Sequence, residues 1–322
     1  MAENKPKTIK SLLAAYHPEN IKKVKKLNFE GIQNNIDIYN ITAPFKIKRT
    51  QYILGRVELR DFEIGSLSVF FYKQKHKRIW RRCKDSPVFN LQDPFRIRFN
   101  GQIIIGGVEI EQKSVEKGLD YRTVFYKGRE LNKLRRCAKG PRRMKGIRFK
   151  KIGNKKIAVF TRPQGKKGGR GKIGFEILDS LNKLTPQHLR KAKIIDNMFA
   201  KGEWGGVNDI HILKDGNLGV LGHIAKFVKD KDGKKRYYYP ITFKFNPETR
   251  EFSGMKILVC RSDLPAGDSK RPDLYNVIYP GGIIRNKQKG EAKLYAGVSD
   301  AESYEITIKD PFKEYEKEES VQ

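Results

Sequence analysis

The sequence predicts an all-β protein, a five-bladed β-propeller with one or two short peripheral helices. Turn signals between short alternating strands recur along the 322 residues, and the strand candidates are too many for a small sandwich. No rhythm of strand, helix and strand is visible, which disfavours a parallel α/β sheet. Five blades would hold roughly 60 residues each, so long loops and irregular blades are expected.

The elements are expected in the following order. A short helix lies near Ile9–Tyr16, and strands follow at Gln51–Val57, Ser66–Tyr72, Ile157–Thr161, Leu218–Phe227, Tyr237–Phe245, Met255–Cys260, Val277–Arg285 and Lys293–Val298. The turns are Asn100-Gly101, Gly153-Asn154, Asp215-Gly216, Asp232-Gly233, Asn246-Pro247-Glu248 and the segment 286–290. A second helix is expected over Pro186–Phe199, because Thr185 suits the N-cap and Pro186 the first helical position.

We expect a single domain over residues 1–322, with an N-terminal extension over about 1–20 and a mobile tail over about 313–322. The three cysteines, Cys83, Cys137 and Cys260, are widely separated, so neither a disulfide framework nor a zinc site is predicted. A reducing cytoplasm fits this usage best. The charged start and the absence of any run of 18 apolar residues predict neither export nor membrane insertion.

The chain is strongly basic. Its 68 Lys and Arg residues exceed its 36 Asp and Glu residues, which gives a formal net charge of +32. Seven basic residues and no acid lie between Lys73 and Lys84, and nine lie between Arg135 and Lys151. Each run alone is typical of a solvated surface, but the total charge predicts an affinity for anions such as nucleic acid or phosphorylated substrates.

Asp93 is the most informative single residue. It stands before Pro94 and ahead of the Asn100-Gly101 hairpin, so its carboxylate lies at the mouth of a strand. Proline disfavours the helical conformation for the residue before it, so we expect Asp93 to be extended and its side chain to be presented. Taken alone, a turn-capping aspartate explains the same pattern.

Three cationic or proton-donating residues also end or begin strands: Lys145, Arg162 and His223. Strand ends next to a propeller axis converge, so these side chains are expected to gather with Asp93. Taken singly, each is explained equally well as a surface charge or a satisfied histidine. Together they predict a site that holds an anion beside one acid.

Several motifs in fixed order resemble one enzyme family. They include Gly55-Arg-Val-Glu58, Asp93-Pro94, Phe160-Thr-Arg-Pro-Gln-Gly165, Gly168-Gly-Arg-Gly-Lys-Ile-Gly174, Glu203-Trp-Gly-Gly206, Leu221-Gly-His223, Arg271-Pro-Asp-Leu274, Tyr279-Pro-Gly-Gly282 and Gly297-Val-Ser-Asp-Ala301. The chain thus resembles the dual-activity β-1,2-mannosyltransferase/phosphorylase family, which is related to the five-bladed propeller β-mannoside phosphorylases. The resemblance runs over most of residues 50–312.

The resemblance implies roles for particular residues. Asp93 matches the family's single general acid, and Lys145, Arg162 and His223 match its phosphate-side positions. Candidates for binding the mannose hydroxyls are Arg56, Glu58, Asn208, Asp209, Tyr239, Arg261, Asp273 and Asp300. Phosphate is already an anionic nucleophile, so phosphorolysis needs cations and one acid, whereas inverting hydrolysis also needs a second carboxylate to activate water.

The leading prediction is a reversible, inverting transfer of mannose between mannose-1-phosphate and β-1,2-linked mannooligosaccharides, with phosphate as co-substrate and neither cofactor nor metal. A GDP-mannose-dependent mannosyltransferase is the neighbouring alternative. A β-mannosidase would release free mannose without phosphate. A fourth interpretation, a basic nucleic-acid-binding protein, depends on Phe71, Tyr72, Trp80 and Phe149 interleaved with the basic runs.

Overall fold

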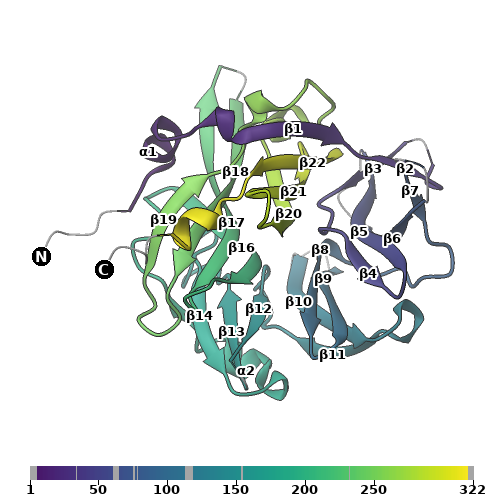
Figure 1. Cartoon of the computed structure of the whole chain (residues 1–322), viewed down its shortest axis with the longest axis horizontal. Coiled ribbons are helices and arrows are strands. Elements are labelled where there is room, and N and C mark those ends of the chain that lie inside the picture. The colour runs from purple at the N-terminus through teal and green to yellow at the C-terminus, as the bar shows by residue number, and fades with distance from the viewer. Residues whose placement is uncertain are drawn as a thin grey trace, which may run out of the picture.

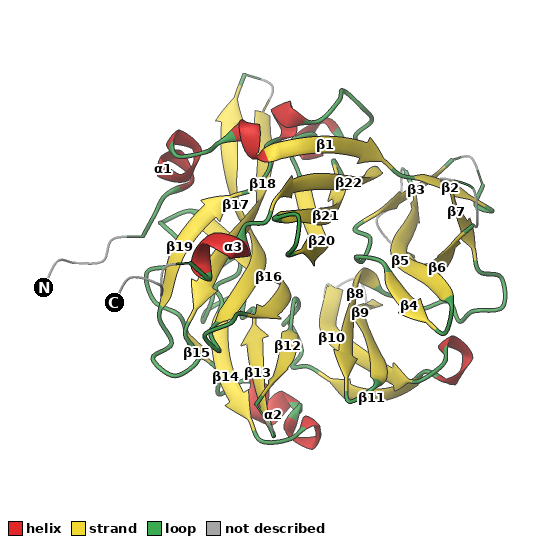
Figure 2. Cartoon of the chain, viewed as in Figure 1, coloured by secondary structure: helices red, strands yellow, loops and turns green. Residues whose placement is uncertain are grey.

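The computed structural model describes residues 6–33, 35–60, 65–74, 77, 79–112, 119–153, 155–231 and 233–317. These residues form five sheets arranged around a central axis, a five-bladed β-propeller, and all strand pairs are antiparallel except β2 (Asn28–Glu30) with β7 (Ile79–Arg82) (Figures 1 and 2). The predicted fold class is therefore confirmed. Asn154 and Asp232 lie outside the described residues, as do positions 75, 76 and 78 of the first basic run, but Ile152 pairs with Lys156 and Asp230 with Gly233 as the expected turns require.

The blades follow one another in chain order. Blade 1 contains β2 (Asn28–Glu30), β3 (Ile36–Tyr39), β4 (Phe45–Ile47), β5 (Thr50–Leu59), β6 (Leu67–Lys73) and β7 (Ile79–Arg82), and blade 2 contains β8 (Gln92–Phe99), β9 (Gln102–Gln112), β10 (Leu119–Gly128) and β11 (Arg135–Lys139). Blade 3 contains β12 (Arg148–Ile152), β13 (Lys156–Thr161), β14 (Gly174–Leu178) and β15 (Lys193–Ile194). Blade 4 contains β16 (Glu203–Ile212), β17 (Leu218–Asp230), β18 (Gly233–Phe245) and β19 (Phe252–Ile257).

Blade 5 joins the two ends of the chain. Its strands β20 (Ile278–Asn286), β21 (Glu291–Val298) and β22 (Glu302–Lys309) come from the C-terminal part, and β1 (Ile21–Lys26) pairs antiparallel with β22. In Figure 1 the purple β1 lies against the yellow β22. This pairing closes the ring and covers an edge that would otherwise be open to another chain.

The apolar core lies between neighbouring blades. Between blades 3 and 4, the rings of Phe160, Phe175 and Phe245 pack with centroids 4.6–5.1 Å apart. Between blades 2 and 3, Phe95, Phe125 and Phe149 form a similar cluster. Because tilted aromatic pairs at this spacing add to the free energy of burial, they fix the blades against one another and leave the axis to polar side chains.

The helices agree only partly with expectation. The described residues contain α1 (Ile9–Ala14), α2 (Pro186–Leu189) and α3 (Phe312–Tyr315), none of them long and apolar enough to cross a membrane. The Thr185 side chain accepts from the His188 N–H, as predicted for an N-cap. The predicted helix to Phe199 is wrong, because the chain turns back after Leu189 and β15 pairs with β14 to complete blade 3.

The first and last described segments of the chain pack against the propeller. Ile9 and Leu12 of α1 are buried in the core, and the Ile9 N–H donates to the Glu203 carboxylate at 2.8 Å. At the other end, Tyr315 is buried and Glu316 accepts two hydrogen bonds from Arg285. Apolar burial and a bidentate ion pair therefore hold these two segments against the propeller, and the division of the chain into an N-terminal extension, one domain and a mobile tail stays a prediction.

Candidate active site

A cavity of about 220 Å³ lies where the blades converge, and it collects side chains from all five. Six of the predicted site residues line it: Arg56, Asp93, Lys145, Arg162, His223 and Asp300. Six polar residues that were not predicted also line it: Asn40, Gln92, Arg148, Arg236, Tyr238 and Tyr279. The volume is small for a ligand pocket and suits a single sugar ring with a phosphate group.

Asp93 sits in a β-bulge at the start of β8. The pairing with β9 slips between Gln92 and Phe95, so Asp93 and Pro94 have no partner residues of their own. The φ of Asp93 is +48°, in the left-handed region, so the expected extended backbone is wrong. Aspartate tolerates this region better than most residues, and the bulge turns its carboxylate into the cavity.

Two donors hold one oxygen of this carboxylate. Asn40 Nδ2 lies 2.8 Å and Arg56 Nη1 3.1 Å from Asp93 Oδ1. Among the described residues, no hydrogen-bond donor reaches Oδ2. Burial raises the pKa of Asp93, but the charges of Arg56 and Lys145 and the Asn40 hydrogen bond outweigh it and lower the pKa below its ordinary value. Asp93 is therefore a carboxylate at neutral pH, with one oxygen left to meet a ligand.

Arg56 is fixed from behind by a buried network. Its Nη2 donates to both oxygens of Glu58, at 3.2 and 3.0 Å, and Glu58 also accepts from Lys270 Nζ and Ser66 Oγ, each at 2.6 Å. The Tyr39 hydroxyl donates to the same carboxylate. Glu58 therefore supports Arg56 from behind the cavity wall, with both oxygens already occupied, and its contact with the sugar stays a prediction.

Arg162 is packed among glycines. Its Nε donates to the Gly205 carbonyl at 2.6 Å. A Cβ on Gly206 would lie 2.8 Å from Arg162 Cδ, and a Cβ on Gly171 would lie 2.6 Å from Nε. Gly146, with φ of +69°, comes within 3.2 Å in the same way. The glycine-rich segments of the sequence thus make room for one buried guanidinium.

Lys145 faces the cavity near Arg162. Its Nζ lies 5.9 Å from the centroid of the Tyr121 ring, and within the described parts of the chain no carboxylate pairs with it. Burial and the neighbouring Arg162 charge lower the pKa of Lys145 to about 8, although Asp93 opposes them. An uncompensated cation of this kind gains from binding an anion.

His223 stands on β17 between two tyrosine rings. Its ring centroid lies 5.6 Å from that of Tyr238 and 5.2 Å from that of Tyr279. Its Nδ1 lies 2.7 Å from Asn208 Oδ1, and Nε2 has no hydrogen-bond partner among the residues described. Burial and the charges of Arg162, Arg148 and Lys145 hold the pKa of His223 well below its ordinary value, so the ring is neutral at pH 7.

Arg148 is a cation that sequence reasoning missed. Its guanidinium lies 3.6 Å from the Phe95 ring centroid and donates to the carbonyls of Ile147 and Asn208, each at 3.1 Å. It belongs to the second basic run, which the sequence alone presents as a solvated surface. The signal for burial was its place at the start of an innermost strand, β12, which only the three-dimensional pairing identifies.

Asp300 follows β21 in a left-handed turn, with φ of +51°. Its carboxylate accepts no hydrogen bond from any described residue, although it lines the cavity. Burial raises the pKa of Asp300 to about 6, Arg56 opposes this and Asp93 adds to it. A carboxylate without partners is suited to accept hydroxyl hydrogens from a sugar.

The charges of the cavity are segregated by blade. The carboxylates, Asp93 and Asp300, come from blades 2 and 5 and share Arg56 of blade 1 between them. The opposite side, from blades 3 and 4, presents the basic residues Lys145, Arg148, Arg162, His223 and Arg236. The cavity therefore has one half that accepts hydroxyl groups and one half that attracts an anion.

The other predicted sugar contacts lie outside the cavity wall. Tyr239 is buried in the core between blades, and Arg261 donates to the Leu264 and Pro265 carbonyls. Asp209 binds the Ile283 N–H at 3.3 Å and lies 3.3 Å from His211 Nε2, because a bulge at Asn208 redirects the strand. These three residues therefore do not line the axial cavity, and their contact with a sugar stays a prediction.

Asn208 and Asp273, which were also predicted to bind the sugar, contact residues of the cavity wall instead of lining the cavity. Asn208 does not line the cavity, but its amide holds His223. Asp273 lies beyond the wall, with Oδ2 3.3 Å from Arg236 Nε. Both residues are therefore one step removed from the ligand, and each contacts a cationic or imidazole group that does line the cavity.

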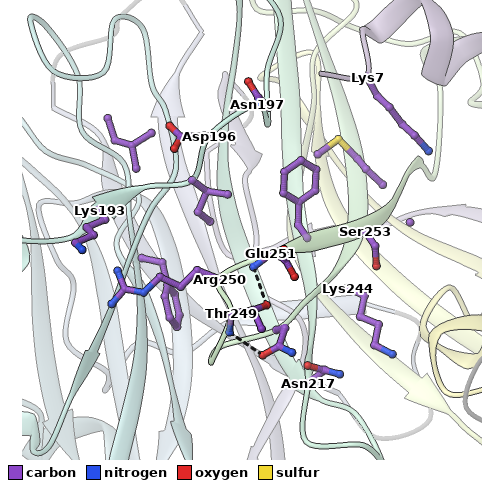
Figure 3. Close-up of a pocket in the computed structure, with 17 residues that line it drawn as sticks. Lys7, Lys193, Asp196, Asn197, Asn217, Lys244, Thr249, Arg250, Glu251 and Ser253 are labelled. Atoms are coloured by element: carbon purple, nitrogen blue, oxygen red, sulfur yellow. Dashed lines mark hydrogen bonds between the residues drawn. The ribbon is translucent and has the colours of Figure 1, made fainter. Parts of the chain in front are cut away.

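A larger groove of about 930 Å³ lies elsewhere, between blade 3 and the outer strands of blade 4 (Figure 3). None of the predicted site residues lines it. Lys244 pairs there with Asp215 at 2.8 Å, and Arg250 lies 3.7 Å from Glu176. Two of its four basic lining residues, Lys244 and Arg250, thus have acidic partners, and the groove collects none of the predicted site residues.

The chain is a glycosyltransferase- or glycoside phosphorylase-like enzyme, as its similarity to solved structures shows, and its axial cavity, in which a held carboxylate faces a set of cations, agrees with this class. The chain belongs to the family described as "Protein of unknown function (DUF1861)", which matches residues 14–314. No curated protein sequence matches it.

Solved structures of similar chains agree with this class. MPT-4, a mannose phosphorylase from Leishmania mexicana in complex with phosphate ion, is 31% identical, with a TM-score of 0.86 over 96% of this chain and 93% of that one. MPT-1, a GDP-Man-dependent mannosyltransferase from the same organism, is 30% identical, with a TM-score of 0.85 over 95% of each. A β-1,2-mannobiose phosphorylase from Listeria innocua, at 12% identity and a TM-score of 0.62 over 94% and 98%, shares the fold.

Proposed function

We propose that this enzyme reversibly transfers mannose between mannose-1-phosphate and β-1,2-linked mannooligosaccharides, with inversion at the anomeric carbon. The observation that carries the proposal is the segregation of charge in the cavity. Mannose occupies the half with Asp93 and Asp300, and phosphate occupies the half with Lys145, Arg162 and His223. The similarity to a mannose phosphorylase and a mannosyltransferase supplies the identity of the sugar.

In phosphorolysis, a phosphate oxygen attacks the anomeric carbon from the cationic half. The glycosidic C–O bond breaks on the opposite side, and the leaving oxygen takes a proton from Asp93. Inversion of a β-linkage then gives α-mannose-1-phosphate and a shorter oligosaccharide. In synthesis, the Asp93 carboxylate accepts the proton of the attacking hydroxyl, and phosphate leaves.

The lowered pKa of Asp93 fits this cycle. The free enzyme holds Asp93 as a carboxylate, which is the form that synthesis requires. Phosphorolysis requires the acid form. Phosphate binding at Lys145 and Arg162 places negative charge beside the cations and so raises the pKa of Asp93 when the proton is needed. Binding of the phosphate nucleophile thus favours the protonated form of Asp93 that phosphorolysis requires.

His223 contributes as a neutral donor. With the Asn208 amide turned so that Nδ2 donates to Nδ1, the imidazole carries its proton on Nε2 and donates it to phosphate. In the orientation that the structure records, Asn208 Oδ1 accepts from Nδ1–H and Nε2 carries no proton, so donation from a neutral His223 requires the turned amide.

Hydrolysis fits the cavity less well. An inverting hydrolase needs a carboxylate base on the face opposite its acid. The second carboxylate of the cavity, Asp300, comes from blade 5 and not from the basic side of blades 3 and 4. The opposite half presents basic side chains, which suit an anionic nucleophile rather than the activation of water.

A nucleic-acid-binding role lacks its stacking surface. Of the four aromatic residues among the basic runs, Phe71, Trp80 and Phe149 are buried in the cores of the blades. Base stacking requires exposed rings.

The sequence predicts no metal, and this stays a prediction. The described residues contain no group of three or more His, Cys, Asp or Glu placed to hold an ion.

The test is incubation with β-1,2-mannobiose and longer oligomers, with and without inorganic phosphate. We expect mannose-1-phosphate only when phosphate is present, and oligosaccharide synthesis when mannose-1-phosphate and an acceptor are supplied. Arg162→Ala should remove phosphate-dependent turnover, whereas Arg190→Ala, an exposed charge on the outside of blade 3, should not. Failure of both directions over a panel of mannosides would refute the proposal.

A further inference from the structure

The groove of about 930 Å³ between blades 3 and 4 is separate from the axial cavity, and the proposed reaction does not use it (Figure 3). The two spaces share no lining residue. Asn217 lines the groove and His223 lines the cavity, six positions further along the chain. These positions belong to the extended strand β17 and the residue before it, so they lie about 20 Å apart. The volume of the groove is near the upper end of the range for ligand pockets, about 300–1,000 Å³.

The groove is balanced in charge, although the protein carries a net charge of +32. Its basic lining residues are Lys7, Lys193, Lys244 and Arg250, and its acidic lining residues are Asp196 and Glu251. Two further carboxylates do not line it but pair with its cations, Asp215 with Lys244 at 2.8 Å and Glu176 with Arg250 at 3.7 Å. Four cations therefore face four carboxylates, two in the wall and two paired with it. This balance suits a neutral ligand and not a polyanion.

Polar side chains without partners converge on the groove from both sides. Asp196 and Asn197 are exposed, and within the described part of the chain their side chains make no hydrogen bond or ion pair. Across the groove in Figure 3, Thr249 N–H donates to Asn246 Oδ1 at 3.2 Å and Glu251 N–H donates to Thr249 Oγ1 at 3.4 Å. These bonds fix the turn, and the Asn246 Nδ2 and the Glu251 carboxylate have no partner among the described residues. The groove thus offers donors and acceptors together, which suits hydroxyl groups because each hydroxyl both donates and accepts.

An aromatic ring forms part of the same wall. Phe252, at the start of β19, is only partly buried, and it packs against the core between blades 3 and 4. The Phe243 ring supports it edge to face, with centroids 6.2 Å apart. A rigid ring held in this way presents an apolar surface to the C–H face of a pyranose, while the polar groups around it meet the hydroxyls. The wall therefore has the mixed character of a carbohydrate-binding surface.

We propose that this groove binds a segment of a neutral mannooligosaccharide chain, as a non-catalytic site that holds the chain while its end reacts in the axial cavity. The inference rests on the proposed function for the identity of the sugar. The cavity of about 220 Å³ takes one sugar ring with a phosphate group, so most of a long chain lies outside it. A second contact on the same protein raises the local concentration of chain ends at the cavity and so raises the affinity for long chains. A disaccharide is too short to bridge the two sites, about 20 Å apart, and gains nothing.

The double change Asp196→Ala with Asn197→Gly tests the groove with little risk to the fold. Both side chains are exposed, and glycine accepts the φ of +54° at position 197. With β-1,2-mannooligosaccharides about ten units long, we expect the KM for phosphorolysis to rise about fivefold, with kcat and the KM for mannobiose within about twofold of wild type. Phe252→Ala should act in the same way, and Phe252→Tyr, which keeps the ring, should not. Native electrophoresis in gels that contain the long oligomer measures binding without turnover, and the double variant should be retarded less than wild type.

Asp179→Ala is the matched control, because Asp179 is another exposed aspartate of the blade 3 segment that does not line the groove. An equal rise in the long-chain KM in this control would reduce the effect to net charge and overturn the assignment. An equal rise for mannobiose in the double variant would also overturn it, since the effect would then belong to the axial cavity. Mannobiose turnover with unchanged retardation of the double variant removes only the groove site. Retardation lost in the double variant, without turnover of any mannoside by wild type, removes only the proposed reaction.

Discussion

Arg56 Nη1 lies 3.1 Å from Asp93 Oδ1, so one oxygen of the proposed acid is fixed by a buried guanidinium while the other faces the cavity. Arg56 is itself held by Glu58, which Lys270 and Ser66 hold in turn. The position of the acid thus depends on a chain of buried polar contacts through blade 1. Such a network is costly to interrupt and keeps the carboxylate in one orientation.

Replacement of Asp93 by Asn removes the proton donor but keeps the shape of the side chain. We expect kcat for mannobiose phosphorolysis to fall by roughly 10²–10⁴-fold, because general acid catalysis contributes about this much. A mannoside with a dinitrophenyl leaving group needs no proton, so its phosphorolysis should fall far less. Comparable losses on the two substrates would argue against a proton-donating role.

The charge of Lys145 should determine how the KM for phosphate changes at alkaline pH. Its pKa of about 8 means that it is charged below pH 8 and loses its charge as the pH rises through this value. The KM for phosphate should therefore increase above pH 8. Lys145→Arg keeps a cation at high pH, so it should flatten this limb, and a profile of KM against pH from 6 to 10 checks it. An unchanged limb in the variant would assign it to another group.

Asp300 should control the acidic limb of sugar binding. Its pKa is raised to about 6, so it is protonated below pH 6 and accepts hydroxyl hydrogens as a carboxylate above it. We expect kcat/KM for the mannoside to fall below pH 6, with little change in the affinity for phosphate. Asp300→Asn should lower kcat/KM at all pH values and remove this limb. Persistence of the limb in Asp300→Asn would contradict the assignment.

Gly206→Ala tests the glycine cradle of the phosphate site. The added Cβ would lie 2.8 Å from Arg162 Cδ and 2.9 Å from His223 Cε1, so both groups must move. A displacement of this size should raise the KM for phosphate by roughly 10–100-fold. Mannose binding, measured by product inhibition, should change little. A phosphate KM within twofold of wild type would show that Arg162 and His223 are not held for phosphate.

Lys270→Met tests the buried network as a source of stability. Lys270 and Glu58 are both buried and 2.6 Å apart, and removal of Lys270 leaves the buried carboxylates of Glu58 and Asp93 to share the charge of Arg56. The free energy of unfolding should fall by about 3–5 kcal/mol. Lys22→Met, which breaks an exposed pair with Glu291, is the control and should cost less than about 1 kcal/mol. If both variants lowered the free energy of unfolding in urea equally, the buried Lys270–Glu58 pair would not be a special source of stability for blade 1.

The hairpins could be predicted from the sequence, because each turn depends on only a few neighbouring residues. Asn100 and Gly101 both take positive φ, as their residue types suggest, and Phe99 pairs with Gln102 across the turn. Asp93 was found for a similar reason, since a carboxylate before proline ahead of a hairpin is visible in the sequence. Its left-handed φ was not, because the bulge arises from pairing with β9.

Residues whose role depends on distant contacts were harder to place. Arg148 and Arg236 were hidden among surface charges, because only the closure of the ring shows which strands line the axis. Tyr239 was mistaken for a sugar contact although Tyr238, its neighbour on the opposite face of β18, lines the cavity. An error of one residue in a strand reverses the face, so motif resemblance without the register cannot decide between them.

The central claim is that an anionic nucleophile attacks from the cationic half while Asp93 acts on the opposite side. Proton and phosphorus NMR of the reaction of β-1,2-mannobiose with inorganic phosphate tests it most directly. The account predicts α-mannose-1-phosphate as the first sugar phosphate formed, one for each glycosidic bond broken, with no free mannose beyond the acceptor. Initial formation of the β-anomer, or an excess of free mannose that appears without phosphate, would contradict it.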